Sequence, residues 1–263
     1  MQSEAHPRRW TALAVIALAQ FMVIADTSII GVALPDIRSD LGFSPEGLSW
    51  VFNAYVIAFG GLLLLGGRLS DLFGAKRVFT AGWVVLSAGS LAAGLAGSPE
   101  VEVAARAVQG AGSALIVPSA LTLLMILFGS NSKELTKAFA VYGAAAPAGG
   151  TAGVFLGGVI TEWLTWPWVF FINIPVALVA LALTPRLMPS TPVRHGSVDV
   201  VGASLATGGL AALAAISTPV ESARPAASEP TARTAQPAVK TRLAPKRSDK
   251  RPPSSSRPPK AMT

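Results

Sequence analysis

The chain has 263 residues, of which 51% are apolar and 13% are charged, and its formal net charge is +7. A composition this apolar indicates a membrane protein, and the absence of cysteine excludes disulfides, a thiol nucleophile and cysteine-ligated metals. The two histidines, His6 and His195, lie outside the apolar runs, so we expect no histidine hydrolase, catalytic residue, metal site or cofactor.

Six apolar runs are each close to the roughly 20 residues that a helix needs to cross a bilayer. They cover residues 11–34, 48–66, 78–97, about 103–128, about 138–160 and about 168–184. The first run is long for a signal peptide, contains Asp26 and is followed by further runs, so we interpret it as a retained helix. A six-helix transmembrane domain is therefore predicted over residues 11–185, after an N-terminal segment of residues 1–10.

Charged residues alternate between the two ends of these predicted helices. One end carries cations, namely Arg8, Arg9, Arg68, Lys76, Arg77, Lys133, Lys137, Arg186 and Arg194. The other end carries mainly acids, namely Asp36, Asp40, Glu46, Glu100, Glu102 and Glu162, with Arg38 among them. Because cation-rich loops stay in the cytoplasm, we predict a cytoplasmic N-terminus and a cytoplasmic loop over residues 186–199.

The chain changes character near residue 216. A weaker apolar run, residues 200–216, is short and rich in Gly and Ala, and we interpret it as a partial seventh helix. Eleven Lys/Arg and eleven Asp/Glu precede residue 218, whereas ten and three follow it, so the whole net charge belongs to the tail. Residues 217–263 are rich in Pro, Ala and Ser and are predicted to be disordered. We favour a solvated tail over contact with acidic lipid, expect no nucleic-acid partner, and leave a frameshift or a truncated gene open as a hypothesis.

Two charged residues within the predicted spans are candidates for proton coupling. A carboxylate inside a membrane span is costly and usually faces a cavity or a cation, so Asp26 is a candidate proton carrier, although it could instead reach water near the helix end. Arg106 starts the segment RAVQGAG in the fourth span, where it either extends to the surface or belongs to a polar patch inside the bundle. If both residues face one cavity, protonation of Asp26 would weaken their attraction and act as a coupling switch.

Other polar and small residues within the spans suggest a cavity and close helix packing. The candidates for a substrate cavity are Tyr55, Gln109 and Asn53, although Asn53 could equally form a hydrogen bond to another helix. The fifth span is rich in small residues whose spacing favours close helix contact and bending. Its glycines include Gly149, Gly150, Gly153, Gly157 and Gly158.

A short basic segment, GRLSDLFGAKR at residues 67–77, separates two long uncharged runs. We predict a tight cytoplasmic loop there, because cations are concentrated between two spans. Its characteristic residues are Gly67, Arg68, Asp71, Gly74, Lys76 and Arg77.

In this order, the motifs resemble the N-terminal half of a major facilitator superfamily transporter, closest to the fourteen-helix drug:proton antiporter branch. The segment 67–77 resembles the superfamily's signature between helices two and three. DTSIIGVALP at 26–35 resembles the branch's first-helix motif, 106–112 its fourth-helix motif and 149–158 its fifth-helix antiporter motif. FFINIP at 170–175 resembles a sixth-helix start, and 199–213 the opening of the seventh helix. The resemblance covers about residues 10–215.

This resemblance implies an all-α, six-helix membrane bundle in a bacterial plasma membrane. It also implies export of apolar or cationic drugs in exchange for protons, with Arg106 linked to the coupling. Three positions depart from the family's pattern: Val154 replaces a usual proline, which weakens the assignment of antiport direction, and Pro167 and Leu72 each replace a common arginine.

The family's substrate path lies between two six-helix halves, and the sequence shows the motifs of one half. We therefore expect the chain to transport poorly or not at all by itself. The alternatives are a non-transporting truncated membrane protein, an assembly partner, or a homodimer that restores both walls of the path. The expected partners are the lipid bilayer, protons, an unidentified small molecule and, in the last case, a second copy; an enzyme is not expected.

Overall fold

The computed structural model describes residues 8–190, together with residues 202, 208, 209 and 212. Its helices are α1 (Arg9–Leu41), α2 (Pro45–Phe73), α3 (Ala75–Gly94), α4 (Pro99–Phe128), α5 (Ser132–Trp163), α6 (Trp168–Phe171) and α7 (Asn173–Leu187). The short α6 and the following α7 are separated by Ile172 alone, so together they form the sixth predicted span. Apart from single residues, the predicted partial seventh helix, residues 191–199 and the tail lie outside the described residues.

Capping residues in the sequence define several helix ends. Ser44 and Ser98 each precede a Pro-Glu pair, and their hydroxyl oxygens accept hydrogen bonds from the backbone amides of the first turns of α2 and α4. The side chain of Asn131 accepts hydrogen bonds from two amides at the start of α5. Proline tolerates the first helical position because the amide that it lacks has no partner there. Helices α2, α4 and α5 therefore begin a few residues before their apolar runs do.

The predicted loop at residues 67–77 is wrong in its extent. Residues 67–73 continue α2 and residues 75–77 begin α3, so the connection is Gly74 alone, whose φ is +88°. Residues 68–73 contain no proline or glycine, and nothing in them interrupts the hydrogen bonding of a helix. A residue with a side chain rarely adopts this backbone conformation, which explains why the chain turns at glycine.

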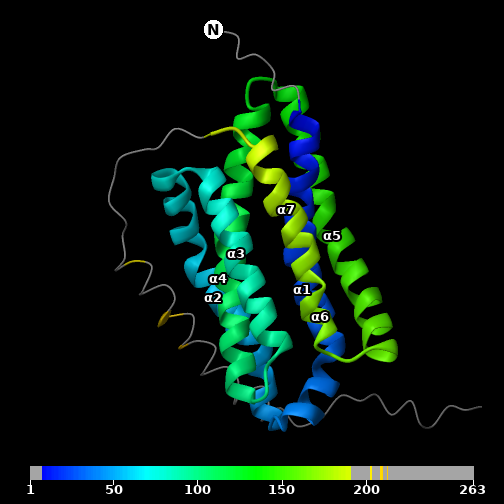
Figure 1. Ribbon diagram of the computed structural model, residues 1–263. Coiled ribbons are helices and arrows are strands. Elements are labelled where there is room, and N and C mark those ends of the chain that lie inside the picture. The colour runs from blue at the N-terminus through cyan, green and yellow to red at the C-terminus, as the bar shows by residue number, and fades with distance from the viewer. Residues whose placement is uncertain (1–7, 191–201, 203–207, 210–211, 213–263) are drawn as a thin grey trace, which may run out of the picture. The chain divides into compact units, whose positions relative to one another are not determined.

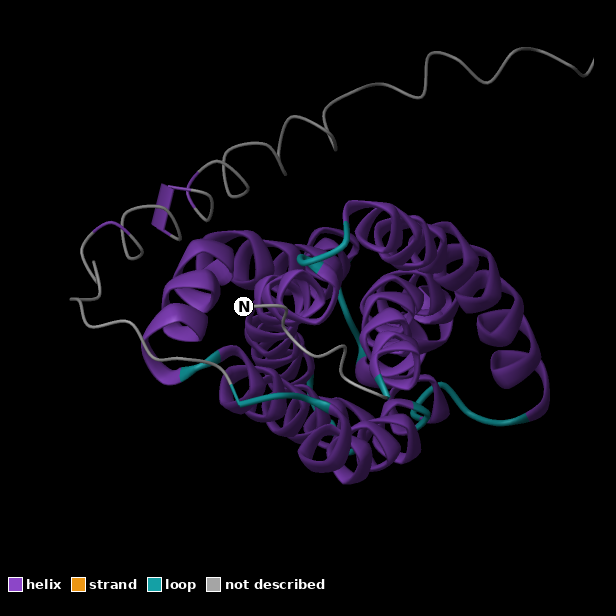
Figure 2. Ribbon diagram, turned by 90° about the horizontal axis from the view of Figure 1, so that it is seen from above, coloured by secondary structure: helices purple, strands orange, loops and turns teal. Residues whose placement is uncertain are grey.

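Figure 1 shows α2, α3 and α4 gathered on one side of the bundle and α1 and α5 on the other. Helix α7 lies between the two groups and contacts both α1 and α3. Seen from above in Figure 2, the helices stand side by side. The connections α1–α2, α3–α4 and α5–α6 lie at one end, and α2–α3 and α4–α5 at the other.

Glycines allow the closest helix pairs to approach. On α5, Gly149, Gly153 and Gly157 lie against the backbone of α1, where an added Cβ would collide with carbonyl oxygens or side chains. Gly110 of α4 lies in the same way against the carbonyl of Tyr55 on α2. In a membrane, helix association depends on such close packing because lipid tails are as apolar as the side chains.

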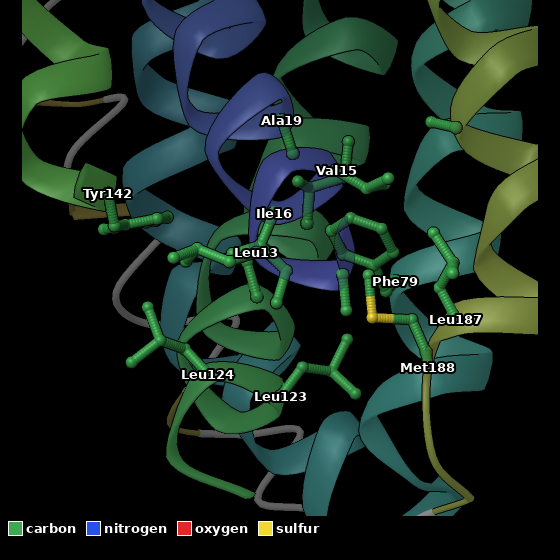
Figure 3. Packing of buried hydrophobic residues seen from close by; sticks show 14 of the residues in the cluster. Leu13, Val15, Ile16, Ala19, Phe79, Leu123, Leu124, Tyr142, Leu187 and Met188 are labelled. Carbon is green, nitrogen blue, oxygen red and sulfur yellow. The ribbon is translucent and has the colours of Figure 1, made fainter. Parts of the chain in front are cut away.

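Two apolar clusters fill the bundle, one toward each end. Figure 3 shows the first, in which Leu13 and Ile16 of α1 pack near Phe79 of α3 and Leu123 of α4. The second contains Ile30 and Ile37 of α1 with residues of α2, α3, α4 and α6. On α1, the residues of the first cluster end at Val23 and those of the second begin at Ile29, so the segment between them is enclosed at both ends by apolar side chains.

Five of the described spans are long and apolar enough to cross a membrane: α1, α2, α4, α5 and the combined α6 and α7. Large apolar side chains also point outward, for example Leu64 of α2 (78% exposed) and Phe155 of α5 (70% exposed). The protein is thus an all-α, multi-pass membrane protein.

Candidate functional site

An ion pair lies between the two apolar clusters. The Nη1 atom of Arg106 on α4 is 2.7 Å from Oδ2 of Asp26 on α1, and the two side chains are 0% and 1% exposed. The two charged residues that the sequence placed inside spans thus meet each other, and neither extends to the surface. A buried charge needs a partner of opposite charge, and here Asp26 and Arg106 are partners of each other.

The second carboxylate oxygen of Asp26 accepts hydrogen bonds from two amides. Asn173 of α7 donates from Nδ2 at 2.6 Å, and Gln109 of α4 donates from Nε2 at 3.4 Å. Both amides also donate to Oγ of Ser90 on α3, at 3.1 and 2.7 Å respectively. All of these residues are buried. Asp26 is thus held by donors on α4 and α7, and Ser90 of α3 joins two of these donors to each other.

Arg106 is fixed by neutral groups as well. Its Nε donates to the carbonyl oxygen of Val51 on α2 at 3.1 Å, and its Nη1 also donates to Oε1 of Gln109 at 2.7 Å. Its Cζ lies 4.5 Å from the ring centroid of Tyr55 and 5.9 Å from that of Phe170. A guanidinium over aromatic rings gains cation–π attraction, most of all when it is removed from water. Arg106 Nη2 is buried with no hydrogen-bond partner.

The three predicted substrate-cavity residues lie in different surroundings. Gln109 belongs to the ion-pair network, and Tyr55 supports it. The Tyr55 hydroxyl donates to Oγ of Ser113 at 2.9 Å and lies 3.4 Å from the carbonyl oxygen of Val23. Asn53 is half-buried on α2. In this conformation Gln109 and Tyr55 hold Arg106.

Of the predicted fifth-helix glycines, those at spacings of four face α1. Gly153 lies against Ala25, the residue next to Asp26, while Gly149 and Gly157 contact α1 one turn away on each side. Gly158 has open space beside it, and Gly150 has only ordinary contacts, with Ile24 and Ser28. The stripe that faces α1 therefore sets how closely α5 supports the helix that carries the carboxylate.

The segment 67–77 lies at the opposite end of α3 from Ser90 and is separate from the ion pair. The Nζ atom of Lys76 donates to the carbonyl oxygen of Pro185 at 2.9 Å, which ties the start of α3 to the end of α7. Lys76 and Arg77 also line a pocket of about 500 Å³ together with Thr80 and Ser190.

Sequence reasoning missed Ser90 and Asn173 as members of the network. Each is a single small polar residue in an apolar span, a pattern that also fits ordinary helix packing. The available signal was the amide of Asn173 at the start of the sixth span, since a buried amide requires a partner. Its partner is 147 positions away in the sequence, at Asp26, so only the fold reveals the pairing.

An ion pair held in this way can respond to a proton. Protonation of Asp26 removes the negative charge opposite Arg106 and converts an oxygen that accepts hydrogen bonds into one that can donate. The donors to the carboxylate come from α4 and α7, and two of them also donate to Ser90 of α3, so the change reaches several spans at once.

The sequence pattern of the Major Facilitator Superfamily matches residues 16–243, which is most of the chain. This chain belongs to the Major Facilitator Superfamily. The membrane bundle and the order of its motifs agree with that assignment.

Several curated relatives are antibiotic export or resistance proteins. The chain is 46% identical over 206 residues to the cephamycin export protein CmcT of Amycolatopsis lactamdurans, covering 77% of this chain and 42% of that protein. It is 44% identical over 209 residues to the puromycin resistance protein pur8 of Streptomyces alboniger, covering 79% and 41%. The lincomycin resistance protein of Streptomyces lincolnensis is 38% identical over 200 residues, with 76% and 41% covered. The match thus spans about two fifths of the length of these relatives.

Solved structures share the fold. A crystal structure of a peptide transporter POT mutant in complex with sulfate gives a TM-score of 0.63 at 13% identity, covering 81% of this chain and 46% of the other. The POT family transporter PepTSo gives 0.64 at 16% identity, with 74% and 40% covered. The described helices therefore form a bundle similar to about half of a major facilitator transporter.

Proposed function

We propose that this chain is the proton-binding half of a drug:proton antiporter, with Asp26 as the proton carrier and Arg106 as its charged partner. The observation that carries the proposal is the ion pair of 2.7 Å, buried between two apolar clusters in the middle of the bundle. The names of the relatives support a small antibiotic-like substrate, exported from the cell.

The free energy of the ion pair is of a suitable size for coupling. Removing one partner of a buried pair costs about 3–5 kcal/mol, because the other charge is left uncompensated. About 5.5 kcal/mol moves a two-state equilibrium from 1:99 to 99:1. Protonation of Asp26 therefore supplies most of the free energy needed to favour a second arrangement of α1 and α4, and release of the proton restores the pair.

The charge distribution supports an orientation for this cycle. The start of α1 and the helix ends beside the connections α2–α3 and α4–α5 are basic, while the opposite end is mainly acidic. We place the basic end in the cytoplasm, because cationic loops stay on that side. Protons then arrive from the acidic, outer end in a bacterial plasma membrane and leave toward the cytoplasm while the substrate moves outward.

A chimera tests this function in a whole transporter. The part of the cephamycin export protein that aligns with residues 8–190 is replaced by those residues of this chain, and cephamycin-dependent proton release is measured in everted membrane vesicles with an acidic interior. We expect the chimera to exchange protons for substrate and Asp26→Asn to abolish the exchange. The control, Asp36→Asn, changes an exposed carboxylate at the outer end of α1 and should leave exchange intact. Equal exchange with Asp26→Asn would contradict the proposal.

The exposed apolar faces of α2 and α5 favour a second proposal about assembly. Side chains such as Leu64 and Phe155 would pack well against a second six-span half, which is either another polypeptide region or another copy. Cysteine crosslinking in native membranes, with single cysteines introduced at these positions of the cysteine-free chain, separates the cases. A crosslinked dimer that transports in vesicles supports self-association, whereas a chain that stays monomeric and inactive by itself requires a different second half.

A further inference from the structure

Glu102 is a buried carboxylate that the ion-pair network does not use. It lies in the first turn of α4 and is 0% exposed. Both of its carboxylate oxygens are buried and have no hydrogen-bond partner. The hydroxyl of Ser98 already caps the amide of Val101, so the helix start has its own acceptor. A carboxylate in this state is strongly unfavourable as an anion, and the group is expected to be neutral.

Its burial distinguishes Glu102 from the other charged residues at this end of the bundle. The exposed ones among the described residues are Asp36, Arg38, Asp40, Glu46, Glu100 and Glu162. The charged groups that act on Glu102 within the described chain are Arg106 of its own helix and Asp26 of α1. The facing part of α3, from Gly89 to Gly94, carries no charged residue.

Glu102 precedes Arg106 by four residues, so the two side chains share one face of α4. The spacing corresponds to about 6 Å along the helix axis. Arg106 uses Nε and Nη1 toward α2, Asp26 and Gln109, whereas its Nη2 is buried without a partner. An unpartnered donor and an unpartnered carboxyl therefore lie one turn apart on the same face of one helix.

We propose that Glu102 is a second proton carrier, which holds the proton while Arg106 is paired with Asp26 and takes over Arg106 when Asp26 is protonated. This proposal rests on the proposed function of Asp26. Arg106, Asp26 and Glu102 together have no net charge when one of the two carboxylates is protonated. This holds whether the proton is on Glu102 or on Asp26. In the exchange, the O–H bond at Glu102 breaks, an O–H bond forms at Asp26, and the guanidinium changes its carboxylate partner.

The position of Glu102 gives the exchange a direction. It lies one turn of α4 closer than Arg106 to the acidic end, which the charge distribution places outside the cell. A proton that enters from that side reaches Glu102 before it reaches Asp26. The transfer leaves the net charge of the buried site unchanged, and so avoids an uncompensated charge inside the membrane.

Infrared spectroscopy of the purified full chain tests the proposal without substrate or gradient. The measured signal is the C=O stretching band of a protonated carboxyl group at neutral pH. We expect this band in the unmodified chain, its loss in Glu102→Gln, and its retention in the control Glu100→Gln, which changes an exposed carboxylate two positions away. Asp26→Asn should also abolish the band, because Glu102 then ionises to pair with Arg106.

Each alternative result overturns part or all of this reasoning. A band that persists in Glu102→Gln, or is absent from the unmodified chain, shows that Glu102 does not hold the proton. A band that disappears in Glu102→Gln but persists in Asp26→Asn rules out the exchange of Arg106 between the carboxylates. Circular dichroism checks that each variant is helical, and Glu102→Leu replaces Glu102→Gln if that variant fails to fold. Because no transport is measured, failure here is distinct from failure of the antiport itself.

Discussion

Replacing Gly153 with alanine tests whether the contact between α5 and α1 positions the site. A Cβ at Gly153 would lie 2.7 Å from the carbonyl oxygen of Ala25 and 2.9 Å from Cβ of Ser28. Both of those atoms are held by the backbone of α1, so a side-chain rotation cannot relieve the clash. Overpacking of this kind costs about 1–3 kcal/mol.

The control variant, Gly158→Ala, isolates that cost. Gly158 is on the same helix and has no atom within 4 Å of an added Cβ. Alanine is favoured over glycine within a helix by about 0.5–1 kcal/mol, and this gain is common to both variants. We therefore expect Gly153→Ala to be about 1–3 kcal/mol less stable than Gly158→Ala.

Reversible unfolding of the full chain in mixed lipid–detergent micelles, followed by circular dichroism as SDS is added, measures the difference. Gly150→Ala is a second control: its Cβ would lie 3.7 Å or more from its neighbours, so this variant should behave like Gly158→Ala. If Gly153→Ala and Gly158→Ala unfold within about 0.5 kcal/mol of each other, the size of a neutral surface change, α1 and α5 are not held by this contact.

Three further substitutions test single features. Arg106→Lys keeps the charge but loses the planar fork and the bond to the α2 carbonyl, so we expect about 1–3 kcal/mol lower stability in the same unfolding assay. Gly74→Ala should cost about 1–3 kcal/mol because of its positive φ, whereas Gly67→Ala, within α2, should be neutral or stabilising; equal effects would contradict the one-residue turn. Trp166→Phe removes the Nε1 donor that lies 2.7 Å from Oδ2 of Asp40, and it should lower the free energy of unfolding by about 1–2 kcal/mol. An unchanged free energy of unfolding would show that this hydrogen bond does not form in the membrane.

The spans could be predicted from the sequence because bilayer thickness sets their length. The ends could not be placed by apolarity alone, since helices continue through polar residues wherever a cap or glycine has not yet stopped them. The segment 67–77 shows this clearly: its charges suggested a loop, but backbone hydrogen bonding continues to Phe73 and only Gly74 interrupts it. Charge indicates which residues avoid the bilayer, whereas backbone conformation determines where a helix ends.

The site was predictable in its charged members and not in its neutral ones. Asp26 and Arg106 stand out because a charge inside a span is costly, so they could be named without a structure. Placing the neutral side chains of Ser90 and Asn173 inside a span costs little free energy, so they do not stand out in the sequence. Their roles depend on which helices become neighbours. Glu102 was assigned to the acidic outer end by its position beside Glu100, yet the first turn of α4 points it inward while its neighbour faces outward.

Some polar atoms of the site have hydrogen-bond partners and others have none. The first group indicates what fixes the arrangement of the helices, and the second indicates how that arrangement could change. The hydrogen-bond network of Asp26, Arg106, Gln109, Ser90 and Asn173 requires α1, α3, α4 and α7 to keep one rotational register, since turning α4 by one residue would carry Arg106 away from its partner. Lipid gives little hydrophobic preference among helix faces, so we infer that these polar contacts select the arrangement. Three of the unpartnered atoms of the site, Arg106 Nη2 and both oxygens of Glu102, lie on α4, and a fourth, Oδ1 of Asn173, lies on α7. A second arrangement that satisfies the three atoms on α4 would keep α4 as the common element and exchange its partner on α1, which is the movement that a proton on Asp26 favours.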